Sequence, residues 1–484
     1  MNSPIRKLAL VAAVMFCALF IASSWIQFVQ ADELRDKPGN RRTLLAEYSR
    51  ERGAILVGGE AVARSETTDD ALKYQRTYPK GKLYSHITGY YSFYYGAGGG
   101  LESADNGLLT GDSDQLFYRR LGDLLTGRQP TGVNLELTID PKTQQAAQEA
   151  LGNQRGAIVA LDPKTGAILA LVSHPQYDPN TLTGHNGDTV QKAWADLNSD
   201  SSRPLIDRVI GGDLYPPGSV FKIVTASAAL SSGRFNESSQ LPGPKVLDLP
   251  ETTAGLVNDW GGACGSGTVD FVQAMAMSCN TAFGWVGMQL GGQAMRDQAA
   301  KFGFGEQLGI PMSVTPSSVP AQMNKPQEAQ SAIGQYDVRV TPLQVAMVTA
   351  AVANQGTVMK PFLVKQTRGA DLEVIGQTAP TQLGQAVTPE VAASLTRMMQ
   401  AVVTSGTGTR AKISGVDVAG KSGTAQHGEG LAPHAWFTAF APVQDPKVAV
   451  AVVVEDGGNA GMSAGGGSVA GPIARDVMEA VIAP

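Results

Sequence analysis

The sequence has few cysteines, few histidines and no excess of positive charge, and each shortage excludes a class of protein. Three cysteines in 484 residues are too few for a disulfide scaffold, and the five histidines show no metal-ligand spacing with them. We therefore expect no zinc site and no cofactor. With 38 basic and 43 acidic residues, the formal net charge of −5 offers no positive field to a polyanion, so no nucleic-acid partner is expected.

The chain does have enough apolar material to fold. Hydrophobic residues make up 43% and charged residues 17% of the sequence, a balance that is typical of globular proteins and not of disordered chains. At this length we expect two or three folded units. The 56 glycines follow no collagen period and are interpreted as turn positions.

One hydrophobic run is long enough to cross a membrane. Residues 8–31 carry no charge, and the first 21 of them are mostly apolar, which corresponds to about 31 Å of helix. Arg6 and Lys7 precede the run, so the positive-inside tendency leaves residues 1–7 as a cytoplasmic tip and the rest of the chain outside the cell. A cleaved signal peptide is the alternative, since residues 29–31 resemble a cleavage site, but the run exceeds the roughly 7–15 residues of such signals. We expect a transmembrane anchor at 8–31.

This placement affects how the cysteines are interpreted. Cys264 and Cys279 would face an oxidising compartment, fifteen residues apart, so a disulfide can form between them. Two buried free thiols are an equally good interpretation. Cys17 lies in the hydrophobic run and is interpreted as a filler of the helix surface.

Hydrophobic periodicity divides the rest of the chain. Residues 32–135 are polar and turn-rich, which is typical of a small, irregular module. Beyond them, strands are predicted at both ends and helices between them. The predicted strands are 132–140, 156–162, 166–174, 417–426, 435–443 and 447–455, and the predicted helices are 140–151, 219–233, 341–356, 388–406 and 469–483. Strands that bracket a helical middle predict an α+β fold, in which one antiparallel sheet has helices on its faces.

Several residues near the C-terminus have an ordinary structural interpretation. Trp436 and Phe437 lie on a predicted strand and are expected in the core or lining a groove. His427 and His434 are interpreted as exposed loop residues and are left out of the candidate site. The glycine-rich stretch 457–467 is expected to be a flexible loop.

A serine and a lysine three residues apart provide the first candidate for chemistry. Serine is a poor nucleophile until a neighbour takes its proton, and Ser219 and Lys222 would lie on one face of helix 219–233. Because Ser219 begins that helix, nearby backbone N–H groups favour negative charge, as an acyl-transfer oxyanion requires. Burial or a neighbouring cation would lower the lysine pKa from about 10.4 and free the amine to act as a base. Such a pair is usually a surface coincidence, so further motifs are needed.

Two further motifs follow in order along the chain. Ser278-Cys279-Asn280 offers a hydroxyl that can relay a proton and a carboxamide that can bind a peptide amide. Lys421-Ser422-Gly423-Thr424 places a cation and hydroxyls at the edge of a predicted strand, where they can hold a carboxylate, and Gly423 allows close backbone approach. Lys164-Thr165-Gly166 is similar to the third motif, but it precedes the serine and is interpreted as a turn. The series Ser-x-x-Lys, Ser-x-Asn, Lys-Ser/Thr-Gly is the one found in penicillin-binding proteins and class A β-lactamases.

The chain as a whole resembles a class B penicillin-binding protein, and within that class the short actinobacterial type often called penicillin-binding protein A. Residues 52–55, 76–92 and 100–111 are similar to its N-terminal dimerisation or pedestal module. The stretches similar to its transpeptidase domain are 156–180, 216–222, 332–335, 341–344, 353–356 and 405–409. The resemblance implies a module at 32–135 and a transpeptidase domain at 136–484, whose β-lactamase-like fold adds an all-helical subdomain to the sheet.

The resemblance also implies a role for each motif residue. Ser219 would attack the D-Ala-D-Ala carbonyl of a stem peptide, and Lys222 would take its proton. Ser278, tuned by Lys421, would pass a proton to the leaving amine. The residues that would hold the substrate are Asn280, Ser422, Gly423 and Thr424, with the N–H groups of Ser219 and Thr424 as the oxyanion hole. An amine from a second stem peptide would resolve the acyl-enzyme and cross-link peptidoglycan.

The partners implied are peptidoglycan stem peptides, β-lactam antibiotics that mimic them, and a membrane glycan polymerase of the SEDS type. The main alternative is a D,D-carboxypeptidase or serine β-lactamase, in which water resolves the acyl-enzyme. The module at 32–135 and the anchor argue against it, because a small secreted hydrolase needs neither. A β-lactam sensor or a scaffold would use the same pocket, but a sensor should carry several membrane spans.

Overall fold

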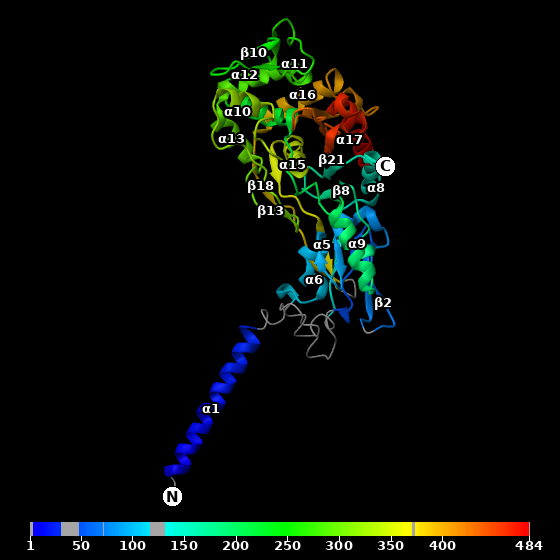
Figure 1. Cartoon of the computed structure of the whole chain (residues 1–484). Coiled ribbons are helices and arrows are strands. Elements are labelled where there is room, and N and C mark those ends of the chain that lie inside the picture. Colours follow the sequence, from blue (N-terminus) through cyan, green and yellow to red (C-terminus); the bar gives the residue numbers. More distant parts are fainter. Residues whose placement is uncertain (1–2, 31–47, 71, 117–130, 370–372, 484) are drawn as a thin grey trace. The chain divides into compact units, whose positions relative to one another are not determined.

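A 26-residue apolar helix, α1 (Ser3–Phe28), opens the computed structural model, which describes residues 3–30, 48–70, 72–116, 131–369 and 373–483 (Figure 1). Within those ranges it is the one helix long and apolar enough to cross a membrane, by length and composition alone. It starts before the predicted anchor at residue 8, because Arg6 and Lys7 continue the helix, and residue 31 lies outside the described residues. By contacts the chain divides into two units, residues 1–51 with 66–75 and residues 52–65 with 76–484.

A five-stranded antiparallel sheet lies in the second unit, in the order β19-β20-β21-β7-β8. Its strands come from both ends of the predicted transpeptidase domain, as the sequence predicts. They are β7 (Gly156–Leu161), β8 (Ile168–His174), β19 (Ala419–Ala425), β20 (His434–Ala441) and β21 (Val448–Val454). The order leaves β19, which carries the third motif, at an edge of the sheet.

Different helices cover the two faces of this sheet because side chains alternate along each strand. On β21, Val452 packs into a cluster with α17 (Gly466–Ile482) and α8 (Pro141–Leu151), whereas Val453 packs into a second cluster with α15 (Pro342–Ala353). Figure 1 shows α15 and α17 on opposite sides of β21. The predicted sheet with helices on both faces is confirmed.

Helices α8 and α16 (Pro389–Thr404) begin where the sequence places their caps. The Asp140 side chain accepts a hydrogen bond from the Thr143 N–H at 2.7 Å at the start of α8, and Thr388 caps α16 in the same way. The chain between the two parts of the sheet is largely helical, as expected, but it also contains short strand pairs. Its elements are α10 (Lys222–Ser231), α11 (Phe271–Ala276), α12 (Asn280–Leu290), α13 (Gly292–Lys301), α14 (Lys325–Ala332), β9 (Gln240–Pro242) with β12 (Thr268–Asp270), and β10 (Val246–Asp248) with β11 (Gly255–Val257).

A second sheet joins early and late parts of the chain, in the order β17-β16-β6-β1-β2-β3. Its strands are β1 (Ile55–Val57), β2 (Glu60–Thr67), β3 (Tyr74–Thr77), β6 (Asn134–Leu137), β16 (Val364–Arg368) and β17 (Val374–Gln377). Because β6 crosses residue 135 and pairs with both β1 and β16, backbone hydrogen bonds connect the predicted module to the later chain.

Smaller elements complete the described chain. They are α4 (Ser85–Thr88), β4 (Tyr90–Ser92), β5 (Gly96–Gly98), α5 (Gly100–Ala104), α6 (Asn106–Thr110), α9 (Gly187–Ser199), β13 (Leu308–Gly309), β14 (Ser313–Val314), β15 (Thr357–Met359) and β18 (Gln382–Gln385). The glycine-rich stretch 457–467 is not the open loop that the sequence predicts. Its residues form 3₁₀ turns (Glu455–Ser463) and then start α17. Only glycine fits at Gly466, because a Cβ there would lie 2.1 Å from the Trp436 carbonyl oxygen.

Candidate active site

The first motif lies where a 3₁₀ turn, η4 (Gly218–Phe221), runs into α10. Ser219 therefore lies in the turn. The sequence predicts that Ser219 begins the α-helix, but α10 begins three residues later, at Lys222. Gly218, the first residue of the turn, has a φ of +54°, which lies outside the helical region. A Cβ at this glycine would lie 2.7 Å from the Thr424 carbonyl oxygen, so the turn packs directly on the third motif. Ser219 is 5% exposed, and Lys222 is fully buried.

The second motif holds the lysine of the first. Ser278 lies between α11 and α12 with a φ of +61°, and Asn280 is the first residue of α12. The Lys222 Nζ donates to the Ser278 carbonyl oxygen at 2.7 Å and to the Asn280 Oδ1 at 2.7 Å, and it lies 3.2 Å from the Ser278 Oγ. Lys222 thus meets Ser278 and Asn280, which follow it by 56 and 58 positions in the chain, in one buried network.

The third motif reaches the same hydroxyl from β19. The Lys421 Nζ donates to the Ser278 Oγ at 2.9 Å and to the Ser422 carbonyl oxygen at 2.8 Å. The Ser422 Oγ lies 2.6 Å from the Thr407 Oγ1. A Cβ at Gly423 would lie 3.1 Å from the Pro217 carbonyl oxygen, so this glycine lets the strand approach the turn that carries the serine. Thr424 follows it, half-buried on the edge strand.

Burial sets the protonation of both lysines. Desolvation, followed by the nearby Lys421, lowers the pKa of Lys222 well below its usual range, while the Asp259 carboxylate acts in the opposite direction. Desolvation lowers the pKa of Lys421 to about 7, and Asp259 again opposes it. Protonating both buried amines, which share one hydroxyl, would place two like charges side by side at a high cost in free energy. A neutral Lys222 at neutral pH is therefore the expected state.

The structure adds two residues that the sequence motifs did not indicate. The Asn280 Nδ2 donates to the Asp259 Oδ1 at 2.9 Å and to the Val257 carbonyl oxygen at 3.2 Å. The Asn258 Oδ1 accepts the Asn280 N–H at 2.7 Å. Both N–H groups of the Asn280 carboxamide are therefore engaged by the protein, and a substrate amide would have to replace one partner. Asn258 and Asp259 stand some twenty positions before the motif in an unremarkable loop, so no spacing in the sequence signals them.

Cys264 and Cys279 form a disulfide. Both cysteines are fully buried, and the bond between them decides between the disulfide and the free-thiol interpretations that the sequence left open. Cys279 is the middle residue of the second motif. The bond therefore ties that motif to the loop that carries Asn258 and Asp259.

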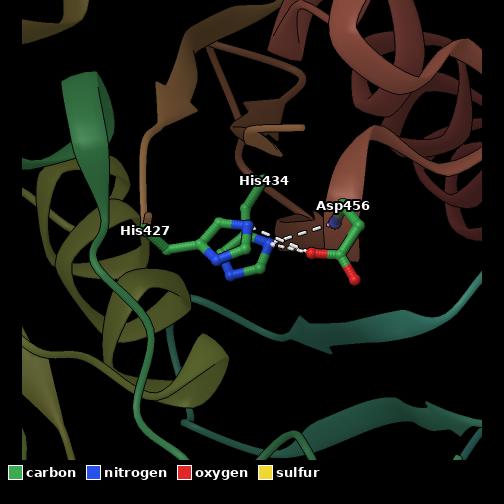
Figure 2. Close-up of side chains that lie close together, drawn as sticks. All are labelled: His427, His434 and Asp456. Atoms are coloured by element: carbon green, nitrogen blue, oxygen red, sulfur yellow. Dashed lines mark hydrogen bonds and ion pairs between the residues drawn. The ribbon is translucent and has the colours of Figure 1, made fainter. Parts of the chain in front are cut away.

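A second group of ionisable side chains lies beyond the third motif, beside a cavity of about 930 Å³ (Figure 2). The Asp456 Oδ1 lies 3.0 Å from the His427 Nε2 and 3.8 Å from the His434 Nδ1. His427 is exposed, as expected, but His434 is 8% exposed and lies on β20, so its prediction as an exposed loop residue is wrong. Burial, followed by the neighbouring His427, lowers the pKa of His434 to about 4. The β19–β20 hairpin brings the two histidines together, which their sequence spacing does not reveal.

The ligand-type atoms of these three residues lie within 4.8 Å of one another. The two imidazole rings are stacked, with centroids 3.8 Å apart and planes 5° from parallel (Figure 2). A metal ion lies close to the plane of each imidazole that binds it, and two stacked planes share no such position. The His434 Nδ1 also accepts the Asp456 backbone N–H at 3.1 Å. In these ring orientations the group is a hydrogen-bonded cluster and not a metal site.

Comparison with known families defines the class of protein. Residues 156–479 match the family described as penicillin binding protein transpeptidase domain, and residues 52–135 match the penicillin binding protein A dimerisation domain. The first match alone spans more than half of the chain. The chain therefore belongs to the penicillin-binding protein transpeptidase family.

Within that family the chain is similar to particular proteins over its whole length. It is 44% identical to the peptidoglycan D,D-transpeptidase PbpA of Mycolicibacterium smegmatis, across 100% of this chain and 99% of that protein. It is 42% identical to the protein of that name from Mycobacterium tuberculosis, with the same coverage. The solved penicillin-binding protein A of M. tuberculosis, a ceftriaxone acyl-enzyme complex, matches with a TM-score of 0.86 and 43% identity, covering 90% of this chain and 100% of that chain.

Proposed function

We propose that this peptidoglycan D,D-transpeptidase cross-links stem peptides through an acyl-enzyme on Ser219. One observation carries the assignment of the site: the Ser278 hydroxyl accepts a hydrogen bond from Lys421 and lies within hydrogen-bond reach of Lys222, which stands three residues after the nucleophile. Solved relatives from M. tuberculosis are acyl-enzyme complexes with ceftriaxone, imipenem and penicillin G, which supports the same covalent chemistry here.

In the acylation step the Ser219 oxygen attacks the carbonyl carbon of the D-Ala-D-Ala bond. Lys222, neutral because it is buried, takes the hydroxyl proton as the new C–O bond forms. The C–N bond then breaks, and Ser278 gives its proton to the departing D-alanine amine while Lys421 or Lys222 restores it. The amine of a second stem peptide then attacks the ester carbon. The new C–N bond forms, the C–O bond to Ser219 breaks, and the proton that the amine loses passes through Lys222 to the serine oxygen.

Four residues of the second and third motifs would bind the donor peptide. Thr424 and Ser422 would offer hydroxyls on β19 to the terminal carboxylate, and Asn280 would hold the side-chain amide of the donor. Gly423 leaves room for the strand and its bound peptide. The N–H groups of Ser219 and Thr424 would face the developing oxyanion, where fixed dipoles stabilise negative charge most.

The same proposal places the protein in its cell. Helix α1 is apolar and exposed along its length, which supports membrane anchoring by residues 8–31. Residues 1–7 would stay in the cytoplasm, and the module at 32–135 and the transpeptidase domain at 136–484 would lie outside, where peptidoglycan is assembled. A membrane glycan polymerase of the SEDS type would supply the strands that this enzyme cross-links.

Intact-protein mass spectrometry with benzylpenicillin tests this function. The wild-type protein should gain the mass of one drug molecule and keep it, and Ser219→Ala should gain none. Ser231→Ala is the matched control, because Ser231 is exposed at the end of α10, and it should acylate like the wild type. An adduct on Ser219→Ala would contradict the assignment. Rapid loss of the adduct with release of hydrolysed drug would favour the carboxypeptidase or β-lactamase alternative.

A further inference from the structure

Asp259 contacts the active site through the carboxamide of Asn280. That carboxamide has two ends: its oxygen accepts from the Lys222 Nζ at 2.7 Å, and its nitrogen donates to the Asp259 Oδ1 at 2.9 Å. If the carboxamide turned over, its oxygen would face the carboxylate and its N–H groups would face the lysine amine. The contact between the carboxamide oxygen and the carboxylate would then be repulsive, so Asp259 selects the orientation in which oxygen faces Lys222.

The position of Asp259 is itself fixed. Its neighbour Asn258 is 1% exposed and accepts the Asn280 N–H at 2.7 Å and the Thr281 N–H at 3.1 Å. The Asn258 Nδ2 donates to the Gly262 carbonyl oxygen at 2.9 Å. The disulfide at Cys279 closes the same loop onto the start of α12. Asp259 is thus held against the second motif, although its own side chain lies at the surface.

Asp259 also acts on the charges of the site. In the described part of the chain, the charged groups that act on Lys222 are Lys421, from β19, and Asp259, from the loop after β11. Lys421 disfavours a proton on Lys222, whereas the carboxylate favours one on both lysines. The carboxylate therefore partly offsets the repulsion between the two amines.

We propose that Asp259 is a positioning residue for acyl transfer, which orients Asn280 toward Lys222 and sets the charge balance of the two lysines. The inference rests on the proposed function, in which Lys222 is the base. It assigns Asp259 no contact with substrate. Its effect reaches the reaction through Asn280 and through the field at the amines.

Two substitutions separate orientation from charge. Asp259→Asn keeps an oxygen that can accept from Asn280 but removes the charge, whereas Asp259→Ala removes both. Asp248→Asn is the matched control, because Asp248 is an exposed carboxylate on the adjacent strand β10. The second-order rate constant for acylation by a fluorescent penicillin would be measured for each full-length protein across about pH 5 to 9.

The rate at the alkaline plateau should fall about tenfold for Asp259→Ala, as expected for one lost hydrogen bond to a charged group. Asp259→Asn should restore that plateau to within about threefold of the wild type. Removing the negative charge lowers the lysine pKa values, so neutral Lys222 persists to lower pH. The acid limb of both variants should therefore shift down by about half a pH unit, a small shift because an exposed carboxylate is screened. Asp248→Asn should change neither quantity.

Two results would overturn the inference while leaving the proposed function intact. One is a wild-type rate and pH profile for Asp259→Ala. The other is an equal loss of acylation rate in both variants with no shift of the acid limb of the pH profile. That result would indicate a general loss of structure, which thermal unfolding of each variant would show directly. A wild-type protein that takes up no penicillin would overturn the proposed function, and this inference with it.

Discussion

At the scale of single residues, the site depends on two buried lysines that have no carboxylate in hydrogen-bond contact among the described residues. Lys222 and Lys421 are fully buried, and the groups they contact are carbonyl oxygens, a hydroxyl and a carboxamide. Neutral acceptors suit an amine that must give and take a proton, because a carboxylate would hold it charged. The same arrangement opposes folding, since each lysine loses its hydration without regaining a full countercharge.

Lys421→Met should therefore abolish acylation yet stabilise the fold. The unfolded lysine has a pKa near 10.4 and the folded one a pKa of about 7, so between these values the unfolded state binds a proton that the folded state lacks. The variant's gain in free energy of unfolding should have its full value at about pH 7 and below, about 2 kcal/mol after allowance for lost hydrogen bonds, and should fade toward pH 10. Urea unfolding at both pH values measures it.

The exposed residue Lys412 supplies the control for that measurement. Lys412→Met should leave the acylation rate unchanged. Its free energy of unfolding should stay within about 0.5 kcal/mol of the wild type at either pH. A loss of stability in Lys421→Met at pH 7 would argue that its hydrogen bonds to Ser278 and Ser422 outweigh the cost of burying the amine.

At the scale of elements, the three motifs meet because an edge strand packs against a 3₁₀ turn. The contact between η4 and β19 leaves no room for a Cβ at Gly218, on the turn side. Gly423 allows the corresponding approach from the strand side. Turn and strand are about 200 residues apart in sequence, so this packing, and not either motif alone, sets the distance between Ser219 and Thr424.

Gly218→Ala should separate these two elements. The substitution meets both a φ of +54° and the Thr424 carbonyl oxygen at 2.7 Å, so we expect a loss of about 3 kcal/mol in stability and at least about a tenfold loss in acylation rate. Gly233→Ala is the matched control, because Gly233 has a φ of +69° but no atom within 4 Å of the added Cβ. It should cost about 1 kcal/mol and leave acylation unchanged. Equal effects of the two substitutions in both assays would exclude the steric account.

At the scale of the whole molecule, two features connect distant parts of the chain. The five-stranded sheet joins strands from both ends of the transpeptidase domain, and the second sheet joins β6 to β16 across more than two hundred residues. Such long-range pairing means that neither sheet is complete within a short segment. The apolar helix α1, by contrast, is a local feature, whose role depends on its length and composition.

Cell fractionation tests the role of α1. The full-length protein should remain in the membrane fraction after an alkaline wash and dissolve in detergent, and its peptide map should contain residues 8–31. Protease added to spheroplasts should digest the domain beyond residue 31. A soluble protein whose chain starts at Asp32 would support the signal-peptide alternative. A variant without residues 1–31 should acylate at the wild-type rate in solution, since no site residue lies there.

Local patterns in the sequence determined the elements and named the chemical groups. Apolar runs separated by turns predicted β7, β8 and β19 to β21, and cap residues such as Asp140 and Thr388 marked helix starts, because these signals depend on neighbours a few residues away. The motif order also identified all three segments that meet at Ser278. The start of α10 was misplaced because the turn before it depends on a contact with Thr424, which lies far along the chain.

Tertiary structure alone decided which side chains meet, because those contacts join segments whose distance in sequence carries no signal. It placed Asp259 behind Asn280, joined Cys264 to Cys279, and brought His434 beside Asp456 in a buried position. It also buried both lysines, and burial is what lowers their pKa values. The sequence by itself determined that this protein carries the groups for acyl transfer; the fold decided their protonation, since desolvation depends on everything packed around them.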